Sequence, residues 1–276
     1  MQNQFLINGR REACLTPLDR GLAYGDGVFR TFLLRRGAVH CWTQHYRRLS
    51  DDCNALGIVC PPAGVLLADV ASLCDPVEQA VLKFIVTRGE GARGYAVAAL
   101  SQPNRVLIKS ALPVYPDQHF NEGVRLHPCQ LRLARQPRLA GIKHLNRLEN
   151  VLARMEWVDT QIADGLLLDS EGLVVECTMS NLFIRRGKTL VTPDLSRCGV
   201  AGVTRQRIID SGSELGYTVK IADFDLSALL AADEVIICNS LYGAWQVRAL
   251  HDTVWPAGAL ASTLRNRLEQ DDAPVA

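Results

Sequence analysis

Glycine-centred turns between short apolar segments are the feature that most restricts the fold of this chain. The segment "NQFLING" (3–9) ends in an Asn-Gly pair, and further turns are expected at 35–37, 170–172 and 186–187. Turns of this kind join antiparallel strands into hairpins. Helical patterns occur between the hairpins without a regular βαβ order, and no G-x-G-x-x-G follows the first strand. The pattern therefore predicts an α+β fold.

The length of the chain allows one or two hydrophobic cores. It has 276 residues, of which 48% are hydrophobic. The segment "PVYPDQHFNEG" (113–123) is rich in Pro, Asn and Gly, which favours a linker. We therefore expect a smaller N-terminal α/β domain over 1–115, a linker over 116–121, and a larger C-terminal domain over 122–276.

Charge and cysteine content exclude several classes of protein. The formal net charge is +1, which offers no basic field for nucleic acid. The nine cysteines form no C-x-x-C pair and have no histidine at ligand spacing, so a zinc site or a disulfide framework is not expected. A signal pattern and an apolar run long enough to span a membrane are both lacking. These features predict a cytoplasmic protein with no nucleic-acid, membrane or metal partner.

The segment "GIKHLNRLENVLARMEW" (141–157) contains one of only five lysines in the chain. Leu145, Leu148, Leu152, Met155 and Ile162 repeat at helical spacing, which predicts a helix that begins beside Lys143. The other lysines have ordinary interpretations: strand residues with one wet face (83, 109), a turn (188) and an alternating segment (220). Lys143 is either a surface residue at a helix end or a nucleophile whose pKa is lowered by its surroundings.

Three other segments place polar groups where a ligand could bind. "GVTR" puts Val203 and Thr204 at a helix N-terminus, where free N–H groups and a hydroxyl suit a phosphate. "IICNS" ends a buried strand with Asn239 and Ser240. Glu176 ends a strand in an apolar stretch, and a buried carboxylate requires a partner. Each signal is weak by itself, because a threonine is a common helix cap.

Together these segments resemble one family. "YGDGVF", "HYRRL", "IKHLNRLENVLAR", "ECTMSNLF" and "GVTR" occur in this order in the fold-type IV pyridoxal-phosphate enzymes, and the resemblance covers roughly residues 5–245. It implies a two-domain fold, a homodimer, and pyridoxal 5'-phosphate bound between the domains. It further implies that Lys143, in the C-terminal domain, forms the Schiff base and carries the proton. The other implied cofactor contacts are Arg48 (with Arg47 as the alternative), Glu176 at the pyridine nitrogen, and Val203, Thr204, Asn239 and Ser240 at the phosphate.

Two stretches bear on the reaction within that family. The ending "RGY" of 87–95 and the "RT" that follows "GDGVF" resemble the aminodeoxychorismate lyases more than the aminotransferases. This implies elimination of pyruvate from 4-amino-4-deoxychorismate to give 4-aminobenzoate; an aminotransferase for D-amino acids or branched-chain amino acids is the alternative. The substrate carries two carboxylates, and the implied substrate contacts are Arg93, Arg30, Thr31, Tyr24 and Arg88. Arg30 and Arg88 are equally compatible with structural salt bridges.

Overall fold

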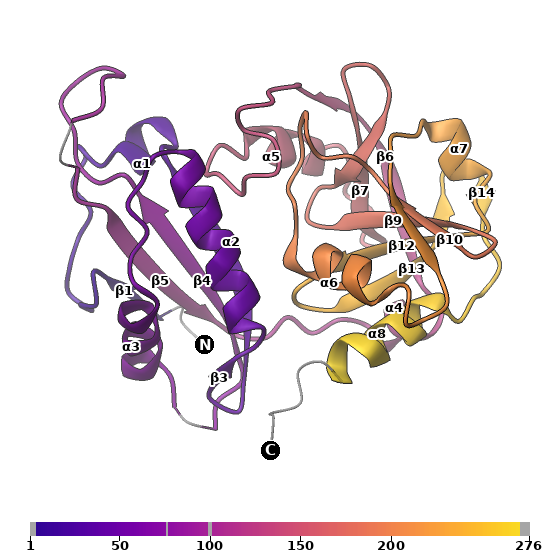
Figure 1. Cartoon of the computed structure of the whole chain (residues 1–276), viewed down its shortest axis with the longest axis horizontal. Coiled ribbons are helices and arrows are strands. Elements are labelled where there is room, and N and C mark those ends of the chain that lie inside the picture. Colours follow the sequence, from indigo (N-terminus) through magenta and orange to yellow (C-terminus); the bar gives the residue numbers. More distant parts are fainter. Residues whose placement is uncertain (1–3, 76, 99–100, 271–276) are drawn as a thin grey trace. The chain divides into compact units, whose positions relative to one another are not determined.

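The computed structural model describes residues 4–75, 77–98 and 101–270 (Figure 1). Its contacts divide the chain into two compact units, Met1–Pro113 with Ile142–Asn146, and Val114–Gly141 with Arg147–Ala276. The short segment Ile142–Asn146, which interrupts the second unit in the sequence, thus belongs to the first unit. It contains Lys143, which the sequence predicted to lie in the C-terminal domain. The expected linker region 116–121 contains the short helix α4 (Asp117–Asn121).

The first unit is built on a five-stranded antiparallel sheet of order β1-β5-β4-β2-β3. Its strands are β1 (Gln4–Ile7), β2 (Gly27–Arg35), β3 (Ala38–Val39), β4 (Ala80–Thr87) and β5 (Asn104–Ser110). The predicted hairpin turn at 35–37 joins β2 to β3 and has Gly37 at φ 73°, a conformation that glycine adopts readily.

Alternation along β2 and β4 gives this sheet two different faces. Phe32, Leu34, Leu82 and Phe84 belong to one buried cluster with apolar residues of α2 (Trp42–Ala55) and α3 (Ala63–Leu73). Their neighbours in the sequence point to the opposite face, because side chains alternate along a strand. Phe29, Thr31 and Lys83 are on that face and are half-buried. A short helix, α1 (Arg20–Tyr24), precedes β2.

The second unit contains a mixed nine-stranded sheet of order β11-β10-β9-β12-β13-β6-β7-β8, with β14 paired to β13. Parallel pairs join β6 to β13 and β7, and β10 to β11; the other pairs are antiparallel. The strands are β6 (Val124–Leu133), β7 (Ile162–Asp169), β8 (Val174–Cys177), β9 (Asn181–Arg186), β10 (Thr189–Thr192), β11 (Thr218–Ile221), β12 (Glu234–Asn239), β13 (Gly243–Leu250) and β14 (Thr253–Val254).

Four more helices belong to this unit: α5 (Leu148–Arg154), α6 (Val203–Ser211), α7 (Leu226–Leu230) and α8 (Leu260–Gln270). Ile208 of α6 and Leu264 of α8 are buried in one cluster with Phe183 and Ile236 of the sheet. Ala153 of α5 packs in a separate cluster. None of the helices in the described ranges is both long and apolar enough for a membrane span.

The region around Lys143 differs from its helical pattern. Residues 142–147 are not helical, and α5 begins only at Leu148. The N–H of Phe29 donates to the carbonyl of Lys143, and the N–H of Leu145 donates to the carbonyl of Gly27, at 2.9 Å each. The backbone therefore pairs with β2 in this segment, and this tertiary pairing overrides the local helical preference.

The apolar face of α5 is exposed. Leu148, Val151, Leu152 and Met155 are 67%, 54%, 47% and 71% exposed, respectively. The helical spacing of these residues does correspond to a helix, but their side chains form its exposed face and do not pack in a core. Ile162, which continued the spacing, begins strand β7.

Candidate active site

Lys143 is positioned by backbone contacts on both sides. Its carbonyl is bound by Phe29, as described above, and its N–H donates to Oδ2 of Asp52 at 3.2 Å. The side chain is half-buried, and its Nζ lies 4.8 Å from the centroid of the Phe29 ring. The lysine thus projects from a fixed backbone toward the face of the sheet opposite α2 and α3.

Asp52 also links Lys143 to a pair of arginines. The carboxylate of Asp52 forms a buried ion pair with Arg30. Burial lowers the pKa of Arg30; the charge of Asp52 counteracts this, and the positive charge of Arg48 adds to the lowering. Arg48 therefore lies near Arg30 and is half-buried, whereas Arg47 is exposed. Of the two arginines in "HYRRL", Arg48 is the one that faces the interior of the first unit.

Arg88 is engaged in a second ion pair, which is partly buried. Its Nε and Nη2 bond to the Asp26 carboxylate at 2.7 and 2.9 Å, and its remaining donors reach the carbonyls of Leu56 and Gly57. Arg30 and Arg88 therefore have the structural partners that the sequence left open as the alternative to substrate contacts.

The "RGY" segment is held by a residue that the sequence analysis did not single out. Arg20 is buried, pairs with Asp26, and donates to the carbonyls of Gly94, Tyr95 and Ala96. The hydroxyl of Tyr24 accepts a bond from the N–H of Gly94 at 3.1 Å. Arg93 is exposed on this segment. Tyr24 thus supports the backbone of the segment that carries Arg93.

Glu176 lies at the end of β8 in the second unit and is 4% exposed. Its Oε2 accepts a bond from the N–H of Val200 at 2.8 Å and lies 3.5 Å from Nδ2 of Asn181. Asn181 in turn accepts from Gly202 and donates to the carbonyl of Val200. Asn181 has no distinctive local signal in the sequence. It connects the strand that carries Glu176 with the loop that leads into α6.

The start of α6 collects hydroxyl groups and backbone donors. Thr204 is buried, and its Oγ1 lies 3.3 Å from Oγ of Ser240, which follows β12. Val203 is the first residue of the helix, so its N–H is among those without a partner in the helix itself. Asn239 has a structural role in the turn after β12. Its Oδ1 accepts hydrogen bonds from the N–H groups of Leu241 and Tyr242 and so stabilises that turn.

The donor set of these residues fits the chemistry of pyridoxal phosphate. A buried carboxylate suits a protonated ring nitrogen, and Glu176 already holds one N–H bond of this type. Two hydroxyls at a helix N-terminus and a half-buried arginine suit a phosphate dianion. A lysine with a fixed backbone suits a covalent link to an aldehyde.

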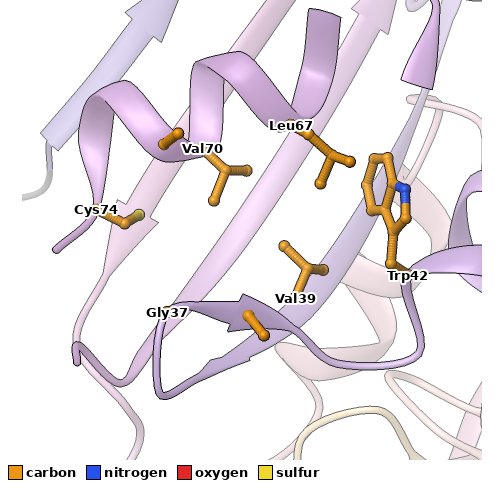
Figure 2. Close-up of a pocket in the computed structure, with 8 residues that line it drawn as sticks. Gly37, Val39, Trp42, Leu67, Val70 and Cys74 are labelled. Atoms are coloured by element: carbon orange, nitrogen blue, oxygen red, sulfur yellow. The ribbon is translucent and has the colours of Figure 1, made fainter. Parts of the chain in front are cut away.

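A separate pocket of about 300 Å³ lies in the first unit between α3 and the β2–β3 hairpin (Figure 2). Its lining is apolar, with the Trp42 ring at one end and the Cys74 thiol at the other (Figure 2). Pockets that bind substrates usually add a few convergent polar groups to such a lining. None of the candidate site residues predicted from the sequence lines this pocket, so it is not the candidate active site.

Comparisons with known proteins agree with this fold. A sequence model of the family described as "Amino-transferase class IV" matches residues 27–250. An aminodeoxychorismate lyase of Vibrio harveyi is 35% identical over 96% of this chain and 99% of its own length. A putative branched-chain-amino-acid aminotransferase of Methanocaldococcus jannaschii is 30% identical over 85% of this chain and 83% of its own. The crystal structure of 4-amino-4-deoxychorismate lyase from Pseudomonas aeruginosa is 48% identical, with a TM-score of 0.91, and covers 97% of this chain and 98% of that one.

Proposed function

The chain belongs to the class IV aminotransferase family, and we propose that within it the chain is an aminodeoxychorismate lyase. The α+β two-domain fold of the fold-type IV enzymes, predicted from the motifs, is confirmed. The reaction is the elimination of pyruvate from 4-amino-4-deoxychorismate to give 4-aminobenzoate. The observation that carries the proposal is similarity over nearly the whole length of two lyases, at 48% and 35% identity.

The proposed cofactor is pyridoxal 5'-phosphate, which supplies an electron sink through its protonated ring when bound. Lys143 would link covalently to it, and Glu176 would keep the ring nitrogen protonated. Arg48, Thr204 and Ser240 would bind the phosphate with help from the N–H of Val203. Asn239 would contribute to phosphate binding indirectly, because it stabilises the turn that carries Ser240.

The reaction needs a base and two anion contacts from the protein. Lys143 would remove the proton from the ring carbon that bears the amine, acting as general base. The enolpyruvyl oxygen then leaves, and the product ring becomes aromatic. Thr31 is half-buried on the same sheet face as Phe29 and would face the substrate, while Arg93 would meet a carboxylate. Arg30 would position Lys143 through its ion pair with Asp52. Arg88 would hold the loop after α2 through its bonds to the carbonyls of Leu56 and Gly57.

We further propose that the active form is a homodimer. The exposed apolar face of α5 supports this, because contiguous exposed apolar side chains mark association surfaces. A second copy of the chain is the occupant that the family resemblance implies.

The test is a product assay. Purified protein incubated with 4-amino-4-deoxychorismate should release pyruvate and 4-aminobenzoate in equal amounts, and Lys143→Ala should release neither. Borohydride reduction followed by peptide mass spectrometry should place the cofactor on Lys143; an adduct on Lys83, Lys109, Lys188 or Lys220 would overturn the assignment of the lysine.

The alternative is amino transfer, which is favoured by the identity to the Methanocaldococcus jannaschii protein and by 29% identity to a D-alanine aminotransferase of Listeria monocytogenes. Conversion of D-alanine or a branched-chain amino acid with a keto acid, without release of pyruvate from aminodeoxychorismate, would establish that activity in place of the lyase.

A further inference from the structure

Cys53 and Cys60 lie beside each other at the end of α2. Cys53 is fully buried in the hydrophobic cluster of the first unit, and Cys60 is half-buried and packs against that cluster. The nine cysteines of the chain are all free thiols in the structure. The side chains of Cys53 and Cys60 hydrogen-bond to each other, so their two sulfur atoms are in contact.

A Schellman motif at the end of α2 brings Cys60 back over the helix. The N–H of Ile58 donates to the carbonyl of Cys53 at 2.8 Å, and the N–H of Gly57 donates to the carbonyl of Asn54 at 3.0 Å. Gly57 has a φ of 64°, the left-handed conformation that this motif requires. The chain therefore reverses its direction at Gly57, and the segment that follows runs back along α2.

One face of α2 surrounds the Cys60 sulfur. Tyr46, Ser50 and Cys53 are spaced i, i+4 and i+7, which places them on one side of the helix. The side chains of all three are hydrogen-bond partners of Cys60. The hydroxyl of Tyr46 also donates to the carbonyl of Pro61 at 3.2 Å. Cys60 is therefore held against Cys53 by the turn on one side and by the Tyr46 bond on the other.

The two thiols differ in how readily they ionise. The hydrogen bond from Cys53, together with those from Tyr46 and Ser50, outweighs burial and lowers the pKa of Cys60. The hydrogen bond to Cys60, together with burial, raises the pKa of Cys53. Burial also raises the pKa of five other thiols, those of Cys74, Cys129, Cys177, Cys198 and Cys238. Because the thiolate is the reactive form, Cys60 is suited to attack an oxidant, and Cys53 is suited to react afterwards.

We propose that Cys60 is a site of oxidation by hydroperoxides and that Cys53 then forms a reversible disulfide with it. The Cys60 sulfur attacks one oxygen of hydrogen peroxide; an S–O bond forms, the O–O bond breaks, and the leaving hydroxide takes the thiol proton to become water. The Cys53 sulfur then attacks the Cys60 sulfur; the S–S bond forms, the S–O bond breaks, and the hydroxyl leaves with the Cys53 proton as a second water. Two thiols are oxidised and one peroxide is reduced. This chemistry does not depend on the proposed function.

A disulfide partner in contact with Cys60 also protects it. A sulfenic acid that finds no thiol is oxidised further to the sulfinic and sulfonic acids, which ordinary thiol reductants do not reverse. We therefore expect wild-type Cys60 to return to the free thiol after treatment with peroxide and then dithiothreitol. In Cys53→Ser, where the hydroxyl can still hydrogen-bond to Cys60, the same treatment should leave Cys60 irreversibly oxidised.

Peptide mass spectrometry of the full-length protein tests the proposal. After exposure to hydrogen peroxide, free thiols are alkylated in denaturant and the chain is cleaved before aspartate. This cleavage gives the peptide 52–68, which contains Cys53 and Cys60 but not Cys74. In the wild type this peptide should carry no alkyl group and should be lighter than its reduced form by two hydrogen atoms. Dithiothreitol added before alkylation should restore both thiols.

Three variants assign the steps. Cys60→Ser should abolish the bridge, and Cys74→Ser, the control at another half-buried thiol of this unit, should retain it. In Cys53→Ser, dimedone should label a sulfenic acid at Cys60. Circular dichroism checks that each variant is folded, and Cys53→Ala replaces Cys53→Ser if the latter unfolds.

Three results would overturn the proposal. One is a wild-type peptide 52–68 without the bridge when the exposed Cys14 of the same sample is oxidised. Another is a bridge that joins Cys60 to Cys74. The third is a folded Cys53 variant in which dimedone does not label Cys60, or in which Cys60 recovers with dithiothreitol as fully as in the wild type.

Discussion

The main-chain N–H of Lys143 donates to Oδ2 of Asp52, and the same oxygen pairs with the guanidinium of Arg30. Asp52 is on α2 and is 3% exposed, so one buried carboxylate joins a helix, a strand and the segment that carries the candidate Schiff-base lysine. A carboxylate that serves two partners in this way fixes the backbone from which the Lys143 side chain extends.

The first prediction concerns this carboxylate. Asp52→Ala leaves the buried Arg30 charge without its partner, and we expect a loss of about 3–5 kcal/mol in the free energy of unfolding. Urea denaturation followed by circular dichroism measures it. Asp51→Ala is the control, because Asp51 is the adjacent residue and is exposed. Equal effects of the two substitutions would show that the Asp52–Arg30 pair does not stabilise the fold.

The second prediction distinguishes the two arginines of "HYRRL". Arg48 is half-buried beside Arg30, and Arg47 is exposed. Arg48→Ala should weaken retention of pyridoxal phosphate by about 2 kcal/mol, because charged hydrogen bonds to the phosphate are lost. Dialysis followed by absorbance of the retained cofactor measures this. Loss of cofactor from Arg47→Ala, with retention in Arg48→Ala, would reverse the assignment.

The third prediction concerns acid stability. Burial tends to raise the pKa of Asp26, but its bonds with Arg88 and Arg20 outweigh this and hold the pKa below the usual 3.8. The folded protein therefore keeps Asp26 charged at a lower pH than the unfolded chain does. Its stabilising contribution is present above pH 3.8 and is lost as the pH falls through the folded pKa.

This contribution can be measured by urea titrations across that pH range. Replacing Arg88 with Met should remove part of the acid-dependent loss of stability, since a main cause of the lowered pKa is gone. Arg93→Met, at an exposed position, is the control. A wild-type-like pH dependence in Arg88→Met would contradict the prediction.

The fourth prediction tests the homodimer. Leu148→Asp places a charge in the exposed apolar face of α5, and it should convert a dimeric protein to monomers in sedimentation velocity experiments, because a buried unpaired charge is unfavourable at an interface. Leu22→Asp is the control, since Leu22 is also exposed, at 69%, but lies on α1. A wild-type protein that sediments as a monomer would refute the dimer, and an unaffected Leu148→Asp dimer would place the interface elsewhere.

Local sequence patterns were sufficient to predict part of this structure. The glycine turns predicted the hairpin between β2 and β3, and the apolar surroundings of Glu176 predicted its burial. Helical spacing predicted the apolar face of α5, but spacing does not reveal whether that face meets a core or remains outside. The backbone pairing of residues 143–145 with β2 also could not be predicted from the local sequence, because it depends on contacts between distant segments.

Dependence on contacts between distant segments also explains why the sequence did not predict a role for Asp52. Asp52 is one of two adjacent aspartates in "SDDC", and only the packing of α2 on the sheet selects it as the buried one.

The last prediction separates an electronic role of Glu176 from a structural one. Oε2 of Glu176 accepts the N–H of Val200, so the residue supports the loop before α6 whether or not it also meets the cofactor. Glu176→Gln keeps the shape and an oxygen that can accept this bond, but it removes the negative charge. If the charge holds the ring nitrogen protonated, the variant should retain the cofactor while turnover falls by roughly two orders of magnitude or more, the scale of lost electrostatic stabilisation.

Steady-state release of pyruvate and the pH dependence of the cofactor absorbance measure the two effects. Glu171→Gln is the matched control, because Glu171 is in the same hairpin with its side chain 66% exposed. Normal turnover and a normal spectrum in Glu176→Gln would refute the electronic role and leave Glu176 with a structural role, which includes its bond from the N–H of Val200. Loss of the cofactor from Glu176→Gln would instead show that the charge is needed for binding, because the amide preserves the support of the loop.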